Sequence, residues 1–383
     1  MNQRAHILTV FGTRPEIIKL MPVLRALESD PGLRVIRLST GQQADLAPPF
    51  LRGFGLDIDE SLGLMVANQS LNELLAKLIS AIDKAIERHL PCAVIVQGDT
   101  TTALAGALSA RFRAVPVIHI EAGLRTGDMN SPFPEESNRK LISQVSSLHL
   151  AATPGNVATL LSEGVAAANI VLTGNPVVDA IQSIATNAVP SAEFRSFLER
   201  LGDQRIVALT AHRRENFGAR LDGYLRVIRD FIAQYDDTVL VFPVHPNPEV
   251  QRSTCKLLGD YERVSLIEPL AYTDFFCLLK AAWLVLSDSG GIQEEVVTLG
   301  KPLLILRERT ERPEATASGT ARLARTPEEL ARELETAAEP DSWCTRVTAA
   351  ENPFGDGRSG ARIASAISAF VEGTEGGQKS GSR

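Results

Sequence analysis

The sequence predicts an α/β fold with two domains, each built on a parallel β-sheet that helices cover. Short runs of β-forming residues alternate with stretches of helical periodicity, and such alternation requires a parallel sheet with helices on both faces. The alternating series occurs twice along the chain. A length of 383 residues is enough for about two domains with separate cores.

The first series predicts the N-terminal domain, over residues 1–178. Its expected strands lie at residues 6–11, 34–39, 92–97, 115–120 and 148–152. Between the second and third of them, apolar residues recur at the spacing of one helix face, at Leu71, Leu74, Leu75, Leu78, Ile79, Ile82 and Ile86.

The second series predicts the C-terminal domain, over residues 179–355. Its expected strands lie at residues 206–209, 239–242, 264–267, 284–286 and 303–306. A last apolar helix is expected at 356–371, after a turn-rich segment. The tail at 372–383 is rich in Gly, Ser and Lys, and we expect it to be disordered.

Composition and charge exclude several classes of protein. A formal net charge of −7 argues against non-specific nucleic-acid binding, although local arginines can still bind an anionic ligand. The four cysteines are far apart without a C-x-x-C pair, which favours neither disulfides nor a metal site. No apolar run is long enough for a membrane helix, and the first apolar run is too short for a signal peptide. We expect a soluble cytoplasmic protein.

A glycine turn in the second domain suggests a phosphate site. Residues 288–291 (Asp-Ser-Gly-Gly) follow an apolar run and open a helical segment. Paired glycines let the backbone approach an anion, which free N–H groups and the helix dipole stabilise. Glu294 and Glu295 suit ribose hydroxyls instead. The alternative is an ordinary glycine turn with acidic residues in the first helical turn.

The same pattern occurs after the first expected strand, in residues 11–16 (Phe-Gly-Thr-Arg-Pro-Glu). Pro15 suits the first position of a helix. Arg14 and Lys19 then face a diphosphate, Arg14 by bidentate contact and Lys19 as a point charge. For Lys19 the alternative is a solvated helix residue, which periodicity alone favours.

Acidic residues follow the strands of the first domain. Asp99 stands after the expected strand at 92–97, either as a helix N-cap or as a ligand-binding group at a strand end. Glu121, Glu135 and Arg139 lie in two loop-rich segments further along. Two neighbouring acids can have their pKa values pushed apart, which gives one acid and one base. Surface ion pairing is the alternative.

Two histidines follow strands of the second domain. His212 stands beside Arg213 and Arg214, and this combination suits a diphosphate or acid–base chemistry next to one. His245 occupies the equivalent place after the next strand. Because a lone histidine is more often structural, His245 is the weaker candidate.

Taken together, these segments closely resemble the non-hydrolysing UDP-N-acetylglucosamine 2-epimerases. The ordered set is specific, although each segment alone is weak, and it runs from residue 11 to residue 357. The matching segments are FGTRPEIIKL, QGDTTTALA, HIEAGLRTGD, SPFPEESNR, TGNPVVDA, TAHRRENFG, PVHPNP, DSGGIQEE, LGKPLLILRERTERPEA and NPFGDG.

The resemblance implies a GT-B architecture, in which two Rossmann-like domains hold the active site in the cleft between them. It also implies a C-terminal helix that packs back onto the first domain, a homodimer, and no NAD or catalytic metal. The missing G-x-G-x-x-G after the first strand agrees with the absence of NAD. The implied partner is a UDP-sugar, with neither nucleic acid nor membrane.

The implied reaction is reversible epimerisation at C2 of UDP-N-acetylglucosamine to UDP-N-acetylmannosamine. UDP is eliminated to leave a 2-acetamidoglucal and then adds back. The resemblance assigns catalysis to Asp99, Glu121, Glu135 and His212, and leaves open which carboxylate is acid and which is base. It assigns substrate binding to Arg14, Lys19, Arg139, Phe275, Ser289, Gly290, Gly291, Glu295 and Arg312.

One segment departs from the family pattern. Where many members read T-G-Q-H, this chain has Thr40-Gly41-Gln42-Gln43, and the region binds a second, activating substrate in many bacterial members. Allosteric activation therefore stays open. Two further alternatives are a 2-epimerase of a related UDP-2-acetamido sugar and a GT-B glycosyltransferase with a UDP-sugar donor.

Overall fold

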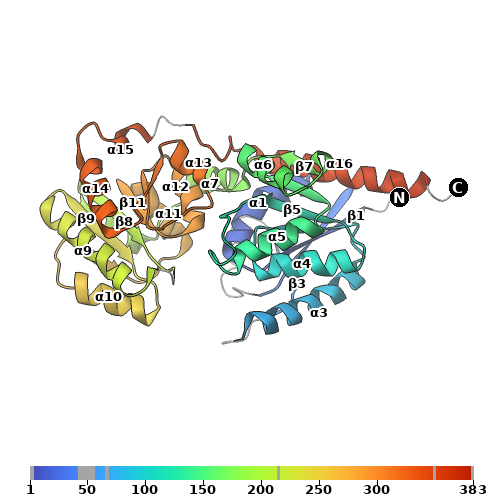
Figure 1. Ribbon diagram of the computed structural model, residues 1–383, viewed down its shortest axis with the longest axis horizontal. Helices are drawn as coiled ribbons and strands as arrows, with labels where there is room; N and C mark the ends of the chain where they lie inside the picture. Colours follow the sequence, from blue (N-terminus) through green and yellow to red (C-terminus); the bar gives the residue numbers. More distant parts are fainter. Residues whose placement is uncertain (1–3, 42–56, 65–68, 214–215, 348–350, 381–383) are drawn as a thin grey trace. The chain divides into compact units, whose positions relative to one another are not determined.

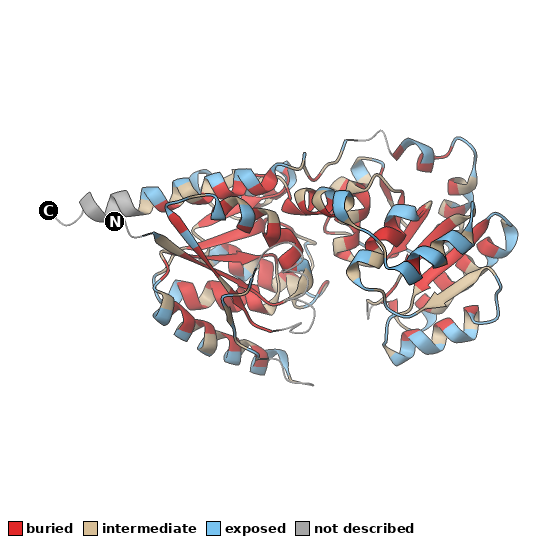
Figure 2. Cartoon of the chain, turned by 180° about the vertical axis from the view of Figure 1, so that it is seen from behind, coloured by how far each residue is buried: buried red, intermediate tan, exposed pale blue. Residues whose placement is uncertain are grey.

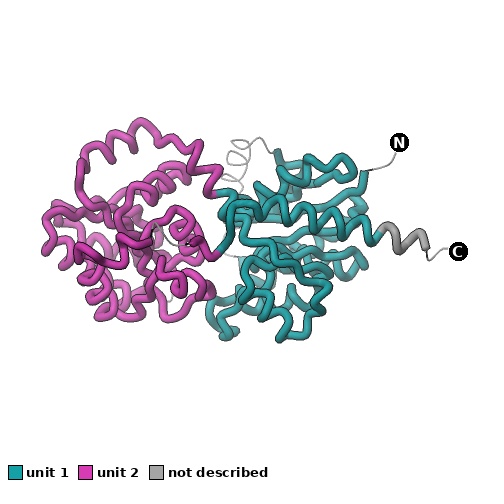
Figure 3. The backbone as a smooth tube through the Cα atoms, turned by 90° about the horizontal axis from the view of Figure 1, so that it is seen from above, with its two compact units in different colours: residues 1–180, 354–383 teal, residues 181–353 magenta. Residues whose placement is uncertain are grey.

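The computed structural model describes residues 4–41, 57–64, 69–213, 216–347 and 351–380. It divides into two compact units (Figure 3): unit 1 comprises residues 1–180 and 354–383, and unit 2 comprises residues 181–353. Each unit contains one parallel sheet with helices around it, so the predicted α/β fold with two Rossmann-like domains is confirmed.

Unit 1 contains a seven-stranded sheet in the order β3-β2-β1-β4-β5-β6-β7. Every pairing in it is parallel. The chain first builds the sheet outward from β1 in one direction and then continues from β4 in the other. The strands are β1 (Ala5–Phe11), β2 (Leu33–Ser39), β3 (Glu60–Ser61), β4 (Ala93–Gln97), β5 (Val117–Ala122), β6 (Leu148–Ala151) and β7 (Ile170–Leu172).

Helices cover this sheet in two layers (Figure 1). One face packs against α3, α4 and α5, whose apolar side chains share a buried core with β1, β2 and β4. On the other face α1 packs against α16. The helices are α1 (Arg14–Glu28), α3 (Leu71–His89), α4 (Thr101–Phe112), α5 (Glu135–Val145), α6 (Pro154–Ser162), α7 (Pro176–Asn187) and α16 (Ser359–Ser380), with a 3₁₀ turn at Ala167–Asn169.

Unit 2 repeats the arrangement with a six-stranded parallel sheet in the order β10-β9-β8-β11-β12-β13. Its strands are β8 (Arg205–Thr210), β9 (Thr238–Pro243), β10 (Val264–Ile267), β11 (Leu284–Ser287), β12 (Leu303–Ile305) and β13 (Ala321–Leu323). Its helices are α8 (Ala192–Leu201), α9 (Ala219–Gln234), α10 (Pro248–Leu258), α11 (Tyr272–Ala281), α12 (Gly290–Thr298), α13 (Pro313–Ala317), α14 (Pro327–Ala338) and α15 (Trp343–Arg346).

The central strands of both units are buried, whereas β3, β7 and β10 are only half-buried or exposed, and the helices expose one side (Figure 2). This is why the strands read as near-continuous apolar runs, which the sequence analysis could detect. The strands that the sequence analysis missed are β3, β7 and β13, which have only two or three residues each. A run of two or three residues is too short to show the alternation of apolar and polar residues that indicates a strand.

The C-terminal tail, which the sequence predicts to be disordered, begins as a continuation of α16. The predicted last helix ends at residue 371, whereas α16 continues to Ser380 and so extends into the segment expected to be disordered. Once a helix is nucleated, each added residue costs little, so α16 continues past its last apolar residues. The α16 N-terminus is fixed within unit 1, because the carboxylate of Asp179 accepts hydrogen bonds from the Ser359 and Gly360 amides at 3.1 and 2.8 Å.

Candidate active site

In unit 1 the predicted site residues lie at the carboxyl ends of strands β1, β4 and β5 or in the helices α1 and α5. The strand order reverses between β1 and β4. Loops at such a reversal part from one another, so open parallel sheets bind ligands there. Asp99 and Glu121 therefore lie at the edge where open parallel sheets bind their ligands.

Glu121 has an unusual backbone. Its φ angle is +66°, in the left-handed region that non-glycine residues rarely adopt, and the register of β5 with β6 shifts at this residue. Strain of this kind persists only where the surroundings fix it, and it is found most often at functional sites. Gly98 lies close by: a β-carbon added there would come 3.4 Å from the Glu121 Oε2.

Three side chains hold the Glu121 carboxylate. Lys19 Nζ forms a buried ion pair with Oε1, and Gln97 Nε2 donates to Oε2. Asn175 Nδ2 donates to Oε1 at 3.5 Å. The interpretation of Lys19 as a solvated helix residue is therefore wrong, because the side chain points inward from α1 and only 6% of the residue is exposed.

Asp99 is held by a second buried cation. Arg139 donates from Nε to Asp99 Oδ2 at 2.8 Å and also reaches the same oxygen with a terminal nitrogen at 2.6 Å. Asn138 Nδ2 donates to the Asp99 carbonyl at 2.8 Å. The N-cap of α4 is Thr100, whose hydroxyl accepts from the Ala103 amide, so the capping explanation of Asp99 is wrong.

The helix α5 supplies the support for Arg139. Glu136 is fully buried and accepts from Arg139 at 3.0 Å and from the Thr126 and Gly127 amides at 3.1 Å each. Glu135 begins α5 and lies one turn before Arg139, so the two side chains project from neighbouring positions on one helix face. The two acidic segments of the sequence thus converge near Asp99.

His119 shapes the turn that precedes Asp99. Its Nε2 lies 2.8 Å from the Gly98 carbonyl oxygen. Complete burial lowers the pKa of His119 to about 3, against the smaller raising effect of this hydrogen bond. The imidazole is neutral at pH 7, and because a carbonyl only accepts, Nε2 carries the proton.

The loop after β1 does not present its backbone to a phosphate, which corrects the sequence interpretation of residues 11–16. The carboxylate of Glu16 already accepts the Gly12 and Thr13 amides, at 3.0 and 2.7 Å. It also accepts the Thr13 and Thr100 hydroxyls, at 2.7 and 2.8 Å. An internal anion thus occupies the N-terminus of α1, and a diphosphate would meet side chains such as half-buried Arg14 instead.

In unit 2 the equivalent loop follows β8 and carries His212. Asp288 is fully buried and accepts the amides of His212 and Arg213 at 3.1 and 3.0 Å, and Asn216 Nδ2 at 3.0 Å. The His212 Nδ1 lies 3.4 Å from Asp288 Oδ1, and the ring stacks on His245 with centroids 6.0 Å apart. Partial burial lowers the pKa of His212, although Asp288 opposes this, so the ring is neutral at pH 7.

The glycine turn at the start of α12 differs from that of α1. Ser289 is the N-cap, no described side chain caps this helix end, and its first turn contains no acid. A β-carbon at Gly291 would meet open space, whereas at Gly290 it would come 2.7 Å from Glu311 Oε1 and 2.9 Å from Arg312. This turn therefore keeps the features of a phosphate-binding helix N-terminus that the loop after β1 lacks.

A buried ion-pair network packs against this turn beside Gly290. Arg312 donates to Glu294 and to Glu311, both at 2.6 Å, and Arg307 donates to Glu311 at 2.8 Å. The predicted substrate contact Arg312 is thus engaged by two carboxylates beside Gly290. The other predicted contacts of unit 2, Phe275 and Glu295, are half-buried in α11 and α12.

The sequence analysis missed several residues of the site, because their role is not visible from their own position in the sequence. Gln97, Asn175 and Asp288 stand inside family-like segments, but the sequence analysis gave them no function. Each acts through a partner distant along the chain, such as Glu121 for Gln97 and Asn175. Gln43, the residue of the departing segment, lies outside the described residues.

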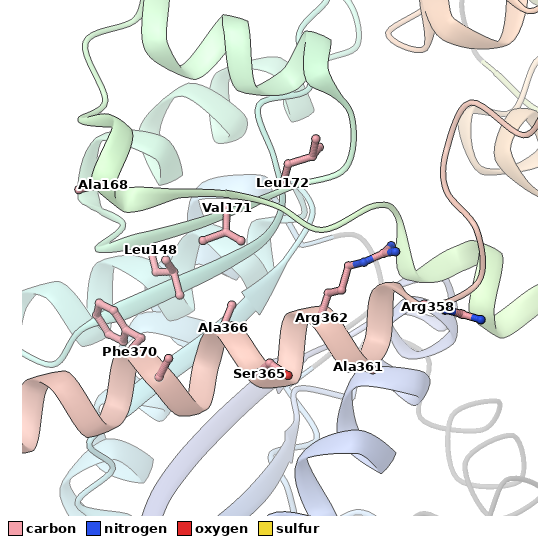
Figure 4. Close-up of a pocket in the computed structure, with 11 residues that line it drawn as sticks. Leu148, Ala168, Val171, Leu172, Arg358, Ala361, Arg362, Ser365, Ala366 and Phe370 are labelled. Atoms are coloured by element: carbon pink, nitrogen blue, oxygen red, sulfur yellow. The ribbon is translucent and has the colours of Figure 1, made fainter.

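Unit 1 also has a groove away from the predicted site residues (Figure 4). The groove has a volume of about 830 Å³ and lies between α16, strand β6 and the edge strand β7, and none of the predicted site residues lines it. Across the described ranges, no cluster of three histidine, cysteine or acidic side chains is arranged to hold a metal ion. None of the described helices is long and apolar enough to cross a membrane.

Comparison with known proteins defines the class of this chain. The profile of a family described as UDP-N-acetylglucosamine 2-epimerase matches residues 25–368. A probable UDP-N-acetylglucosamine 2-epimerase of Ralstonia nicotianae is 41% identical over 370 residues, which are 95% of this chain and 99% of that protein. The crystal structure of the Neisseria meningitidis UDP-GlcNAc 2-epimerase bound to UDP-GlcNAc is 36% identical, with a TM-score of 0.89, over 94% of this chain and 99% of its own.

The fold and these matches define an isomerase with a GT-B-like architecture. The chain belongs to the UDP-N-acetylglucosamine 2-epimerase family. A glycosyltransferase of kitacinnamycin has the same fold, with a TM-score of 0.64 over 96% of this chain and all of its own. It is only 12% identical, so that likeness concerns the fold alone.

The buried pair of Lys19 and Glu121 should contribute measurably to the free energy of unfolding. We expect Lys19→Met to lower the free energy of unfolding by about 3 kcal/mol, because it leaves a buried carboxylate without its cation. Adding Glu121→Gln should recover part of that loss. Urea denaturation of the single and double variants measures both effects, and a Lys19→Met cost below about 1 kcal/mol would contradict a tight buried pair.

Proposed function

We propose that this protein interconverts UDP-N-acetylglucosamine and UDP-N-acetylmannosamine by eliminating UDP and adding it back. The observation that carries the proposal is the pair of acids at the carboxyl ends of β4 and β5. Asp99 and Glu121 stand at adjacent strand ends, and each is fixed beside a buried cation. Rigidly held carboxylates at a ligand-binding edge suit proton transfer at a carbon atom.

Unit 2 supports the nucleotide part of the proposal. Its glycine turn at Ser289–Gly291 combines an uncapped helix N-terminus with space for an anion, and neutral His212 lies after the neighbouring strand. We assign the diphosphate to this turn, the ribose to Glu295 and the uracil to Phe275. The related Neisseria enzyme binds UDP-GlcNAc.

The chemistry explains why both kinds of group are needed. The C2 proton of the sugar is only weakly acidic, so the C1–O bond to UDP must break well ahead of proton removal. The C2–H electron pair then forms the C1=C2 double bond, and UDP leaves with the C1–O pair. Donors around the diphosphate stabilise the charge that develops there. Re-addition with the proton delivered to the opposite face gives the epimer, which requires protonatable groups on both faces.

One assay distinguishes the proposed epimerase activity from the two alternative activities. We expect the protein, incubated with UDP-N-acetylglucosamine alone in D₂O, to form UDP-N-acetylmannosamine with deuterium at C2, as followed by NMR. A glycosyltransferase would release UDP only with an acceptor, and a 2-epimerase of a related sugar would be active on another UDP-2-acetamido sugar instead. Absence of both exchange and product would exclude the proposal.

Substitution should separate chemistry from binding. We expect Asp99→Asn to lower turnover at least about 100-fold while changing UDP affinity by less than about threefold, because it removes proton transfer and no phosphate contact. Arg14→Ala should instead weaken UDP binding on the order of tenfold. Calorimetric titration with UDP and the epimerase assay measure the two effects.

The control is Asp83→Asn, which removes an exposed carboxylate of α3 paired with Arg113. This control should leave both UDP affinity and turnover unchanged. Full activity in Asp99→Asn would show that the carboxylate assignment is wrong.

The homodimer that the sequence predicts stays a proposal, supported by exposed apolar side chains on neighbouring helices of unit 1. Leu90, Phe112 and Leu141 lie on or directly after the neighbouring helices α3, α4 and α5, and they are 80%, 78% and 51% exposed. Such side chains gain most from burial in an interface. The cytoplasmic location also stays a prediction.

We expect Phe112→Glu to convert a dimer into a monomer, because a charge would have to be buried in the interface. Light scattering after size exclusion measures the mass. Val189→Glu, at another exposed apolar residue, in unit 2, is the control that should remain dimeric. A monomeric wild-type protein would refute the dimer.

A further inference from the structure

The carboxylate of Glu16 joins two loops of unit 1 that carry predicted site residues. Its Oε2 accepts from Gly12 and Thr13 in the loop after β1, and its Oε1 accepts from the Thr100 hydroxyl in the loop after β4. Arg14 follows the first contact and Asp99 precedes the second. Each oxygen therefore serves a different loop, across the point where the strand order reverses.

An ordinary helix cap does not need this arrangement. The helix α3 has the same capping box, in which Glu73 accepts from the Ser70 amide and hydroxyl at 2.8 and 3.0 Å. Glu73 is exposed, and within the described part of the chain its side-chain hydrogen bonds go to Ser70 alone, which is enough to begin that helix. Since α1 could be capped in the same exposed way, capping alone does not explain a buried carboxylate that reaches a second loop.

The burial of Glu16 is also unfavourable. Only 2% of the residue is exposed, and among the described residues no cation is paired with it. Burial raises the pKa of Glu16, although the hydrogen bonds from Thr13, Thr100 and Gly12 oppose the rise. A group whose pKa is raised on folding contributes stability below its unfolded pKa, and this contribution is lost as the pH rises through the folded value. Burial thus makes the ionised form of the Glu16 carboxylate less favourable in the folded protein than in water.

We propose that Glu16 is a positioning residue, which fixes the loop of Arg14 relative to the loop of Asp99 through the Thr100 hydroxyl. This inference rests on the proposed function of Asp99 and Arg14. Asp99 is then held from two sides, by Arg139 at its carboxylate and by Glu16 through its neighbour Thr100. The leaving group and the proton-transfer group gain a fixed separation, on which the rate depends steeply.

The first test compares two substitutions of Glu16. We expect Glu16→Ala to lower turnover about 10- to 100-fold, because the two loops lose their connection. Glu16→Gln should retain most activity, since its amide oxygen accepts the Gly12 and Thr13 groups while its nitrogen donates to the Thr100 oxygen. Glu73→Ala removes the equivalent capping carboxylate of α3 and is the matched control, which should turn over like the wild type.

The second test does not depend on activity. Hydrogen exchange of peptides that cover residues 98–103 should become faster in Glu16→Ala and stay unchanged in Glu16→Gln and Glu73→Ala. If the wild-type protein did not epimerise the sugar, the proposed function would fail, but this measurement would still report whether Glu16 restrains the second loop. Unchanged exchange in Glu16→Ala would overturn the positioning role.

Thr100 provides an independent variant in case Glu16→Ala does not fold. Thr100→Val removes the hydroxyl that donates to Glu16, and we expect it to lower turnover as Glu16→Ala does, with Thr100→Ser restoring it. Because Thr100 also caps α4, Thr326→Val at the cap of α14 is the control for lost capping. Wild-type turnover in Thr100→Val, or a loss in Glu16→Gln as large as in Glu16→Ala, would overturn the proposal.

Discussion

The site of this epimerase-family protein depends on one recurring interaction, a buried carboxylate that bridges the two loops at the strand-order reversal of each sheet. In unit 1 Glu16 bridges the loops after β1 and β4, and in unit 2 Asp288 bridges the loops after β8 and β11. Open parallel sheets diverge at this point, which creates room for a ligand. The carboxylates keep the two sides of that opening together.

The two bridges leave different helix ends available. In unit 1 the carboxylate comes from the helix and fills its N-terminus, so the edge of this sheet offers side chains, among them Asp99 and Glu121. In unit 2 the carboxylate comes from the loop after β11 and satisfies His212 and Arg213, so the N-terminus of α12 keeps its own amides. Under the proposed function, this difference suits unit 1 to acid–base chemistry and unit 2 to anion binding.

Sequence analysis predicted the two-domain α/β fold because buried parallel strands leave apolar runs that local patterns reveal. It also located the segments that carry Asp99, Glu121 and His212, which stand at strand ends. It failed where a partner distant along the chain decides the outcome. The helical periodicity places Lys19 at a position typical of a solvated residue. The side chain is nevertheless buried, because it pairs with Glu121, 102 positions further along the chain. The loop at residues 11–16 has the pattern of a phosphate turn, and nothing local shows that Glu16 folds back into it.

The left-handed backbone at Glu121 limits which residues can replace it. Glycine adopts this conformation without strain, and the strained residue costs of the order of 1–3 kcal/mol. Glycine has no carboxylate, however, so relief of the strain would remove the acid. Exchange of Glu121 for glycine would also leave the buried Lys19 ammonium without its carboxylate, and this loss offsets the relief of backbone strain, so selection for stability alone has little to gain at position 121.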